Sequence, residues 1–216
     1  MARSARLFAT VVAFAAISAL VLQYALLLRV AANAVGPWFA TLRFFSYFTI
    51  LSNLAVALVA MAAAFGHAGW FDRPRVRGGV ALCIGVTCAV YHFVLAATWA
   101  PTGLQWLVDV ALHYVVPALY WAWWVACVPH GRLAWTDALR WLAVPLAYLA
   151  WTLLRGVWVH EYPYPFIDVD ALGGTLVARN AGVVAALFLC VGLVLVAFDR
   201  MLGRRSGTMK ASQSTS

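Results

Sequence analysis

The chain has 216 residues, of which 65% are hydrophobic and only 10% are charged, and its formal net charge at pH 7 is +8. Soluble domains are about half apolar and about a quarter charged, so this composition excludes a soluble globular protein and indicates that lipid is the solvent. The positive charge is typical of loops beside anionic lipid headgroups and does not indicate a nucleic-acid partner. The four cysteines lie in apolar runs without metal-ligand spacing, which favours free buried thiols.

Six apolar windows are long enough to cross a bilayer, which takes a helix of roughly 20 residues. They cover residues about 7–28, 44–65, 79–99, 107–128, 139–159 and 181–198. The first window has a basic start like a signal peptide, but its apolar run is longer than a signal peptide's, so we expect a retained helix. The sequence predicts an all-α polytopic membrane protein, with a six-transmembrane-helix bundle in residues 1–205 and a disordered cytoplasmic tail in residues 206–216.

The basic residues predict the orientation, because loops rich in Arg and Lys stay in the cytoplasm. With the N-terminus inside, eleven basic residues fall on the cytoplasmic side and four on the external side. The first group is Arg3, Arg6, Arg73, Arg75, Arg77, Arg132, Arg140, Arg200, Arg204, Arg205 and Lys210, and the second is Arg29, Arg43, Arg155 and Arg179. We therefore expect a multi-pass protein of the cell membrane with both termini in the cytoplasm.

Polar residues in the second to fifth helices need a reason, because an ionisable group at the bilayer centre costs about 2.5–3.5 kcal/mol. With this orientation, four of them share a depth in the outer half of the membrane: Thr49, His92, His113 and Arg155. Three stripes have helical spacing, namely Ser46, Thr49 and Asn53; Asp109, His113 and Pro117; and Tyr148, Thr152 and Arg155. Stripes that must avoid lipid predict a shared cavity open to the outer leaflet.

Each of these residues also has a purely structural explanation. A Ser or Thr in a membrane helix commonly bonds the carbonyl of its own preceding turn, and a His or Asn often joins two helices. Asp109 lies near a helix start, where the dipole favours an acid, and Arg155 can extend to the external headgroups. The agreement in depth and spacing, rather than any one residue, favours a site.

The constellation permits nucleophilic chemistry on an ester. A threonine hydroxyl needs a base within hydrogen-bond reach, and His113 is the natural base for Thr49. Asp109, one turn away, can orient the imidazole, as the acid does in a catalytic triad. Oxyanion donors are expected from Ser46, Asn53 or His92, and Arg155 is expected to hold a carboxylate or phosphate group.

The connection between the fifth and sixth helices contains the proline- and tyrosine-rich segment 162–168. Its prolines enforce an extended, stiff chain, so we expect either a structural cap on the bundle or a lid over the outer cavity. Its Tyr164 is included among the candidate binding residues, together with Thr152 from the third stripe.

Two segments resemble the active helices of the androgen-induced/androgen-dependent membrane protein family, whose members hydrolyse fatty acid esters of hydroxy fatty acids. These segments are Tyr47-Phe-Thr-Ile-Leu-Ser-Asn-Leu54 and Asp109-Val-Ala-Leu-His-Tyr-Val-Val-Pro117. The resemblance implies that Thr49 is the nucleophile and His113 the catalytic histidine. The segment Tyr162-Pro-Tyr-Pro-Phe-Ile-Asp168 is similar to a bacterial branch, the "Pr-six-Pr" integral membrane proteins, for which no activity is implied.

Three functions therefore stay open. The first is an intramembrane lipid-ester hydrolase without a cofactor, with membrane lipids as neighbours and a fatty-acyl ester as substrate. The second is a non-catalytic membrane protein that binds a lipid, solute or partner in its polar interior. The third is a metal-dependent hydrolase, because two histidines and an acid can hold zinc. Its ligands would come from His92, Asp109, His113, His160 and Glu161.

Overall fold

The computed structural model describes residues 2–67 and 69–213, and 86% of the chain is helical. The described residues include six helical stretches that are long and apolar enough to cross a membrane. These are Arg3–Ala31, Phe48–Phe65, Pro74–Thr98, Gly103–Cys127, Trp135–Val159 and Gly174–Arg204. The predicted all-α, six-helix membrane fold is therefore confirmed, and each predicted window falls within or largely overlaps one of these stretches.

The elements follow the chain with short connections. They are α1 (Arg3–Val35), α2 (Pro37–Phe44), α3 (Phe48–Phe65), η1 (Trp70–Asp72), α4 (Pro74–Val90), η2 (Tyr91–Leu95), η3 (Ala96–Thr98), α5 (Gly103–Val110), η4 (Ala111–Val115), α6 (Val116–Cys127), α7 (Trp135–Trp141), α8 (Ala143–Val159), η5 (Pro165–Ile167), α9 (Val169–Leu172) and α10 (Gly174–Gln213). The segments η2 and η4 are π-helical turns, and η1, η3 and η5 are short 3₁₀ turns.

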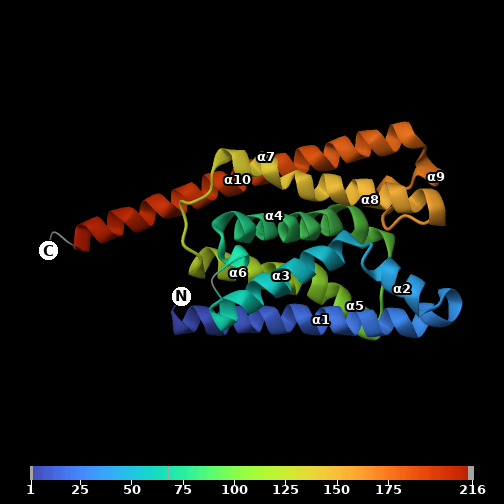
Figure 1. Ribbon diagram of the computed structural model, residues 1–216, viewed down its shortest axis with the longest axis horizontal. Helices are drawn as coiled ribbons and strands as arrows, with labels where there is room; N and C mark the ends of the chain where they lie inside the picture. Colours follow the sequence, from blue (N-terminus) through green and yellow to red (C-terminus); the bar gives the residue numbers. More distant parts are fainter. Residues whose placement is uncertain (1, 68, 214–216) are drawn as a thin grey trace.

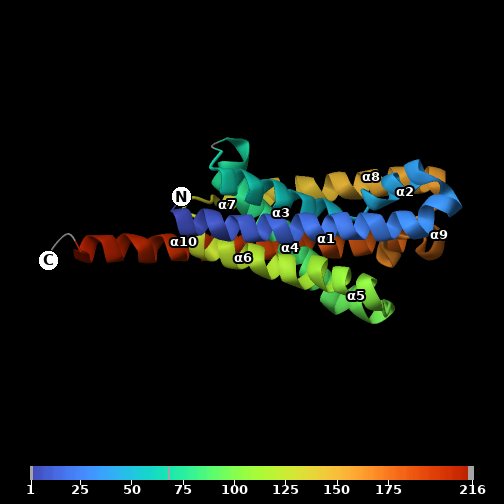
Figure 2. The same cartoon turned by 90° about the horizontal axis from the view of Figure 1, so that it is seen from below.

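Helix α4 lies at the centre of the bundle (Figure 1), where it contacts α3, α6 and α10. On one side of it, α1 runs along α3 and touches α6, and on the other side α7 and α8 lie beside α10. Figure 2 shows the same bundle from below, with α5 and α6 inclined to α1. The core on the α1 side includes the fully buried Tyr120, Trp123 and Trp124 of α6, so these two tryptophans serve packing.

Both ends of the described chain lie at the same end of the bundle (Figure 1). This is the arrangement that an even number of crossings requires. The bundle end near the termini carries the α3–α4 and α6–α7 connections, and the opposite end carries α2, α9 and the α8–α10 connection. Which end faces the cytoplasm stays a prediction from the basic residues.

Two boundaries differ from the sequence prediction. The predicted window 44–65 is broken, because α2 ends at Phe44 and α3 begins only at Phe48, with a turn between them. At the other end of the chain, α10 continues to Gln213, so residues 206–213 of the expected disordered tail are helical, and residues 214–216 lie outside the described residues. Apart from Gly203 and Gly207, residues 200–213 include several good helix formers, such as Met, Leu, Arg, Lys, Ala and Gln, which suit this continuation.

Candidate functional site

Thr49 lies at the start of a helix rather than in its middle. Tyr47 has extended backbone dihedral angles and is the residue before α3, so Thr49 is the second residue of that helix. The first N–H groups of a helix have no carbonyl partner within it. The N–H of Thr49 therefore donates outward, to the phenolic oxygen of Tyr164 at 3.2 Å. The side chain is buried, with 8% of the residue exposed.

The predicted base is within reach of this hydroxyl. His113 Nε2 lies 3.3 Å from Thr49 Oγ1, a long but direct contact between side chains 64 residues apart in sequence. His113 Nδ1 lies 3.0 Å from the main-chain oxygen of Asp109 and 3.3 Å from its Oδ1. A carbonyl oxygen can only accept, so Nδ1 carries the hydrogen and, in the neutral ring, Nε2 presents its lone pair to Thr49.

Tyr91 completes the surroundings of the acid. Its hydroxyl donates a hydrogen bond to Asp109 Oδ2, and its ring stacks on His113 with centroids 3.7 Å apart and planes at 14°. Tyr91 and His113 each lie in a π-helical turn, η2 and η4. Such turns insert one residue into a helix and occur frequently at functional sites. Asp109 is thereby held from two directions while only 5% of it is exposed.

A chamber of about 420 Å³ opens beside these groups, and it is called the polar chamber here because charged, amide and hydroxyl side chains contribute to its otherwise apolar wall. Thr49, Tyr91, Asp109 and His113 line it, and its other polar lining residues are Gln23, Arg43, Tyr47, Thr98, Trp99, Gln105 and Tyr164. Gln105 Nε2 donates to Gln23 Oε1 at 2.9 Å, which joins α5 to α1 across the chamber. A cavity is therefore present between the helices, with the predicted Thr49 and His113 on its wall, and its opening to the outer leaflet stays a prediction.

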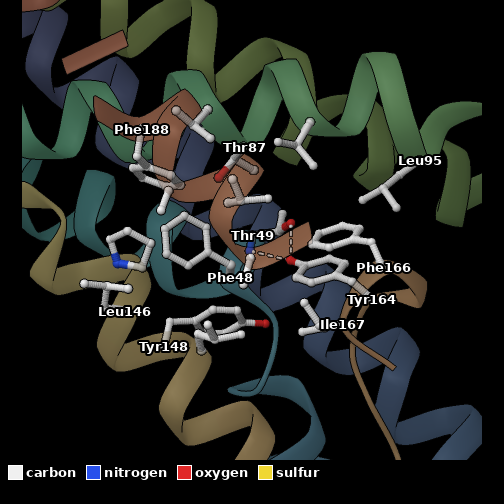
Figure 3. A pocket seen from close by; sticks show the side chains of 17 residues that line it. Phe48, Thr49, Thr87, Leu95, Leu146, Tyr148, Tyr164, Phe166, Ile167 and Phe188 are labelled. Carbon is white, nitrogen blue, oxygen red and sulfur yellow. Dashed lines mark hydrogen bonds between the residues drawn. The ribbon is translucent and has the colours of Figure 1, made fainter. Parts of the chain in front are cut away.

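A second, apolar cavity of about 80 Å³ meets the first at Thr49 (Figure 3). Its wall consists mainly of apolar side chains from α3, α4, α8 and α10, including Phe48, Leu146 and Phe188. Thr49, Leu95 and Tyr164 line both spaces. The threonine hydroxyl therefore lies where a polar chamber and an apolar cavity join.

Tyr164 covers this junction. Its hydroxyl lies 3.3 Å from Thr49 Oγ1, and its ring stacks on Phe166 with centroids 5.3 Å apart (Figure 3). Burial raises the pKa of the Tyr164 hydroxyl, against the opposing effect of the hydrogen bonds with Thr49. The phenol therefore keeps its proton at neutral pH and can act as a donor. This placement fits both expected roles of the connection, a structural cap on the bundle and a lid over the cavity.

Ser46 and Asn53, two of the expected oxyanion donors, donate their hydrogen bonds to main-chain carbonyls instead. Ser46 precedes the helix, so it does not share a stripe with Thr49, and its Oγ donates to the carbonyl of Leu42. Asn53 is fully buried, and its Nδ2 donates to the carbonyls of Thr49 and Leu112. Asn53 therefore ties α3 to the turn that carries His113, which is a supporting role for the site.

His92, Thr152 and Arg155 do not line the polar chamber or the apolar cavity. His92 is exposed and contacts the Tyr114 hydroxyl at 3.2 Å, because it lies one residue after Tyr91, which takes the inward position. Thr152 Oγ1 donates to the carbonyls of its own preceding turn. The structure thus supports the structural explanation for these two residues.

Arg155 is paired rather than available to an anion. Its Nη1 donates to the carbonyl of Glu161 at 3.0 Å, and its Nη2 lies 3.2 Å from Glu161 Oε2. Glu161 Oε1 is also 2.5 Å from Nε of Arg43, which lines the chamber. The two arginines therefore clamp the start of the α8–α10 connection that carries Tyr164. Arg43 and Tyr91 are lining residues for which the sequence analysis assigned no role.

The residues of the metal hypothesis are not brought together. His160 Nδ1 pairs with Asp170 at 2.9 Å, Glu161 pairs with two arginines, and His92 contacts a tyrosine. Over residues 2–67 and 69–213 no group of three or more His, Cys, Asp and Glu side chains is placed to hold a metal ion. Asp109 and His113 are left as the only two members of the set that touch.

Comparison of the chain with protein-family models, curated proteins and solved structures finds no match. The class that the fold defines is an integral membrane protein with six apolar helices. The function of its polar interior is therefore argued from the geometry of the residues themselves.

Proposed function

We propose that the protein is an intramembrane hydrolase of lipid esters, with Thr49 as nucleophile and His113 as general base. The observation that carries the proposal is the chain of contacts from Thr49 Oγ1 through the His113 ring to Asp109. Nucleophile, base and orienting acid in hydrogen-bond order are the arrangement by which hydroxyl nucleophiles are activated. The resemblance of the segments around Thr49 and His113 to a family of lipid-ester hydrolases supports the same assignment.

In the first step, Thr49 Oγ1 attacks the ester carbonyl carbon and its proton passes to His113 Nε2. The imidazolium that forms is stabilised by Asp109, whose carboxylate is oriented by the Tyr91 hydroxyl. The tetrahedral intermediate then expels the alcohol, which takes the proton from Nε2 as the carbon–oxygen bond breaks. An acyl-threonine remains. Asp109 and Tyr91 are positioning residues in this scheme.

In the second step, water attacks the acyl-threonine while His113 Nε2 accepts a proton from it. The acyl–Oγ1 bond breaks, Oγ1 recovers its proton from the ring, and a carboxylic acid leaves. Atoms and charges balance without a cofactor. Water can be held in the polar chamber, because polar side chains including Gln23, Gln105 and Arg43 line it.

The N-terminus of α3 supplies an oxyanion hole. The N–H of Thr49 lies beside its own Oγ1 and points at the Tyr164 oxygen, so a substrate carbonyl oxygen that displaces the phenol inherits this donor. The Tyr164 hydroxyl, moved aside but still adjacent, donates the second hydrogen bond. These donors replace the side chains of Ser46, Asn53 and His92 that the sequence analysis favoured.

The test is covalent labelling of purified protein with an alkyl fluorophosphonate. We expect labelling of the wild type and none of Thr49→Ala, because the adduct forms on Oγ1. The matched control is Thr152→Ala, which removes a buried threonine hydroxyl outside both cavities. Equal labelling of Thr49→Ala and the wild type, or loss of labelling in Thr152→Ala, contradicts the assignment.

The second candidate is a protein that binds a lipid or solute in the chamber without turning it over. The observation that favours it is the Tyr164 hydroxyl, which covers Thr49. The direct contact between Thr49 Oγ1 and His113 Nε2 counts against it, since a binding site does not need an activated nucleophile. Retention of a bound lipid without any covalent adduct in the wild type distinguishes this candidate from the hydrolase.

A further inference from the structure

A separate cavity of about 310 Å³ is lined by the end of α3 that lies away from Thr49 and by the start of α1. Its lining comes from the ends of α1, α3 and α4 and from the α6–α7 connection. Three arginines face it, namely Arg6, Arg77 and Arg132, together with His67. Among the described lining residues, Asp72 is the one carboxylate, so the wall carries an excess of positive charge.

Arg77 provides a fixed cation in this wall. Only 4% of the residue is exposed, and its guanidinium carbon lies 5.3 Å from the centroid of the Trp123 ring. Its Nη2 lies 2.5 Å from Asp72 Oδ1, and its carbonyl accepts a hydrogen bond from Tyr120. A buried guanidinium held by a carboxylate and an aromatic face keeps its orientation, so it costs little further entropy when a ligand binds.

Arg6 is held by the shape of the neighbouring helix. Its guanidinium lies against Gly66, which ends α3 in the left-handed conformation with φ of 71°. A Cβ at position 66 would lie 2.6 Å from Arg6 Nη2, so the glycine leaves the space that this side chain occupies. Arg132 is exposed on the α6–α7 connection and lines the same cavity. The charges of Arg6 and Arg132 exceed what Asp72, already paired with Arg77, can balance.

We propose that this cavity binds a phosphate group. Guanidinium groups present planar forks of donors that match phosphate oxygens, and three of them line one space here. The cavity lies at the ends of the membrane-spanning stretches, the level at which lipid headgroups reside, and basic pockets between helices bind anionic headgroups there. The ligand is therefore a molecule with a phosphate group, either an anionic lipid or a small soluble phosphate ester.

The experiment measures the thermal unfolding of detergent-purified protein and uses two sources of phosphate. One arm titrates glycerol 3-phosphate, and the other titrates phosphatidic acid in mixed micelles, with phosphatidylcholine as the neutral reference. We expect the unfolding temperature of the wild type to rise in at least one arm. A rise with the soluble ester alone assigns a soluble ligand, and a rise with phosphatidic acid identifies the headgroup. No rise in either arm overturns the proposal.

Matched variants separate the cavity from diffuse attraction of anions to a basic surface. Arg6→Gln and Arg132→Gln remove lining charges, whereas Arg3→Gln and Arg73→Gln remove the same charge at the same end of the bundle outside the lining. We expect each lining variant to weaken the apparent affinity about tenfold, as loss of a charge-assisted hydrogen bond does, and each control to change it less than about twofold. A control variant that loses as much affinity for the phosphate compound as a lining variant overturns the proposal. The readout does not involve Thr49, so it is independent of the hydrolase.

Discussion

At the scale of single residues, Tyr164 has the most unusual position near Thr49. Its oxygen lies 3.2 Å from the main-chain nitrogen and 3.3 Å from Oγ1 of that residue. These are the two atoms between which a substrate carbonyl must fit if Thr49 is a nucleophile. In the proposed mechanism, the phenol oxygen therefore lies where a substrate carbonyl oxygen would bind. Because its pKa is raised by burial, it stays a neutral donor at physiological pH.

The first prediction concerns the hydroxyl of Tyr164. In Tyr164→Phe the ring still stacks on Phe166, but the second oxyanion donor is lost. Loss of one such donor typically lowers kcat about 100- to 1,000-fold, and we expect the lower part of this range because Thr49 N–H remains. Fluorophosphonate labelling rates and hydrolysis of a fluorogenic acyl ester measure it.

Tyr162→Phe is the control for this change, since Tyr162 belongs to the same connection but lines neither cavity. It should keep wild-type kcat. A Tyr164→Phe variant that hydrolyses the ester as fast as the wild type would show that the phenol only covers the site and donates nothing to the reaction.

At the scale of elements, irregular helix segments place the site. The turn between α2 and α3 puts Thr49 in the first turn of a helix, where its N–H is free to point at a ligand. The two π-helical turns rotate Tyr91 and His113 toward each other so that their rings stack. Regular helices through these three segments would leave Thr49 with its N–H bonded inside the helix and change the direction of both rings.

These irregularities mark the limit of sequence prediction for this chain. The six helices were predictable, because hydrophobic length is a local property of the sequence. The approach of Thr49 and His113 was predictable too, because both had to share a depth and avoid lipid. Their chemical roles stay predictions. The helix break at residues 45–47 contains neither Gly nor Pro, so the amino-acid sequence did not predict it.

The direction of individual side chains was the part that could not be predicted. His92 and Tyr91 are neighbours, and the π-helical turn decides which of them faces the chamber. Arg155 was expected to meet an anionic ligand, but its partner Glu161 lies in the following connection, where no helical period constrains its position. Arg43 was counted only among the basic residues of the external side, and its place in the chamber wall was not predicted. Such pairings depend on the tertiary course of a loop.

The second prediction concerns the packing of the α8–α10 connection against α8. Gly156 of α8 lies directly against the Tyr162 ring, and an added Cβ would overlap it. We expect Gly156→Ala to displace the connection and to lower the stability of the fold by about 1–3 kcal/mol, because the added methyl group overpacks the contact with Tyr162. Hydrolysis should fall clearly, because Tyr164 lies only two residues after Tyr162. Gly182→Ala in α10 is the control, since no atom lies within 4 Å of its added Cβ. Unchanged hydrolysis in Gly156→Ala would mean that the position of the connection does not matter for the site.

A partly buried histidine outside the site, His130, joins the α6–α7 connection to α10. His130 Nδ1 lies 3.0 Å from Asp199 Oδ1, and its Nε2 lies 3.0 Å from the carbonyl oxygen of Val125. Both partners accept, so both ring nitrogens carry hydrogens and the ring is cationic. Burial lowers the pKa of His130, but the hydrogen bonds to Asp199 and Val125 outweigh it, and the net shift is upward.

The third prediction is the pH dependence that follows. Because the folded pKa of His130 lies above its ordinary value of 6.5, the stabilisation is complete below that value. It is lost as the pH rises through the folded pKa. We expect the unfolding temperature of the wild type in detergent to fall as the pH rises above 6.5 and through the raised pKa of His130. At the acid end of the pH range, His130→Gln should be less stable than the wild type by about 1–3 kcal/mol, because it loses hydrogen bonds of the charged ring. Its unfolding temperature should also vary less with pH. A His130→Gln variant with the wild-type pH profile contradicts this role.

At the scale of the whole molecule, the two ends of the bundle differ in charge. The end near the termini carries the cavity lined by Arg6, Arg77 and Arg132. The opposite end carries the α8–α10 connection with Glu161, Asp168 and Asp170, and Thr49 lies at the start of α3 on that side. A basic end is retained on the cytoplasmic side during insertion, so the chamber should face the external leaflet and the phosphate cavity the cytoplasmic leaflet. The orientation decides which lipids can reach either space.

The fourth prediction is therefore the orientation itself, tested with two matched substitutions in a background in which the four cysteines are replaced by alanine. Thr102→Cys lies in the exposed connection before α5, and Thr136→Cys lies in the exposed first turn of α7. The two positions flank the membrane-spanning stretch Gly103–Cys127, so they must lie on opposite sides of the bilayer. A membrane-impermeant maleimide added to intact cells should label Thr102→Cys, and it should label Thr136→Cys only after the cells are opened. The reverse pattern would place the termini and the arginine-lined cavity outside, and Thr49 would then receive its ester from the cytoplasmic leaflet.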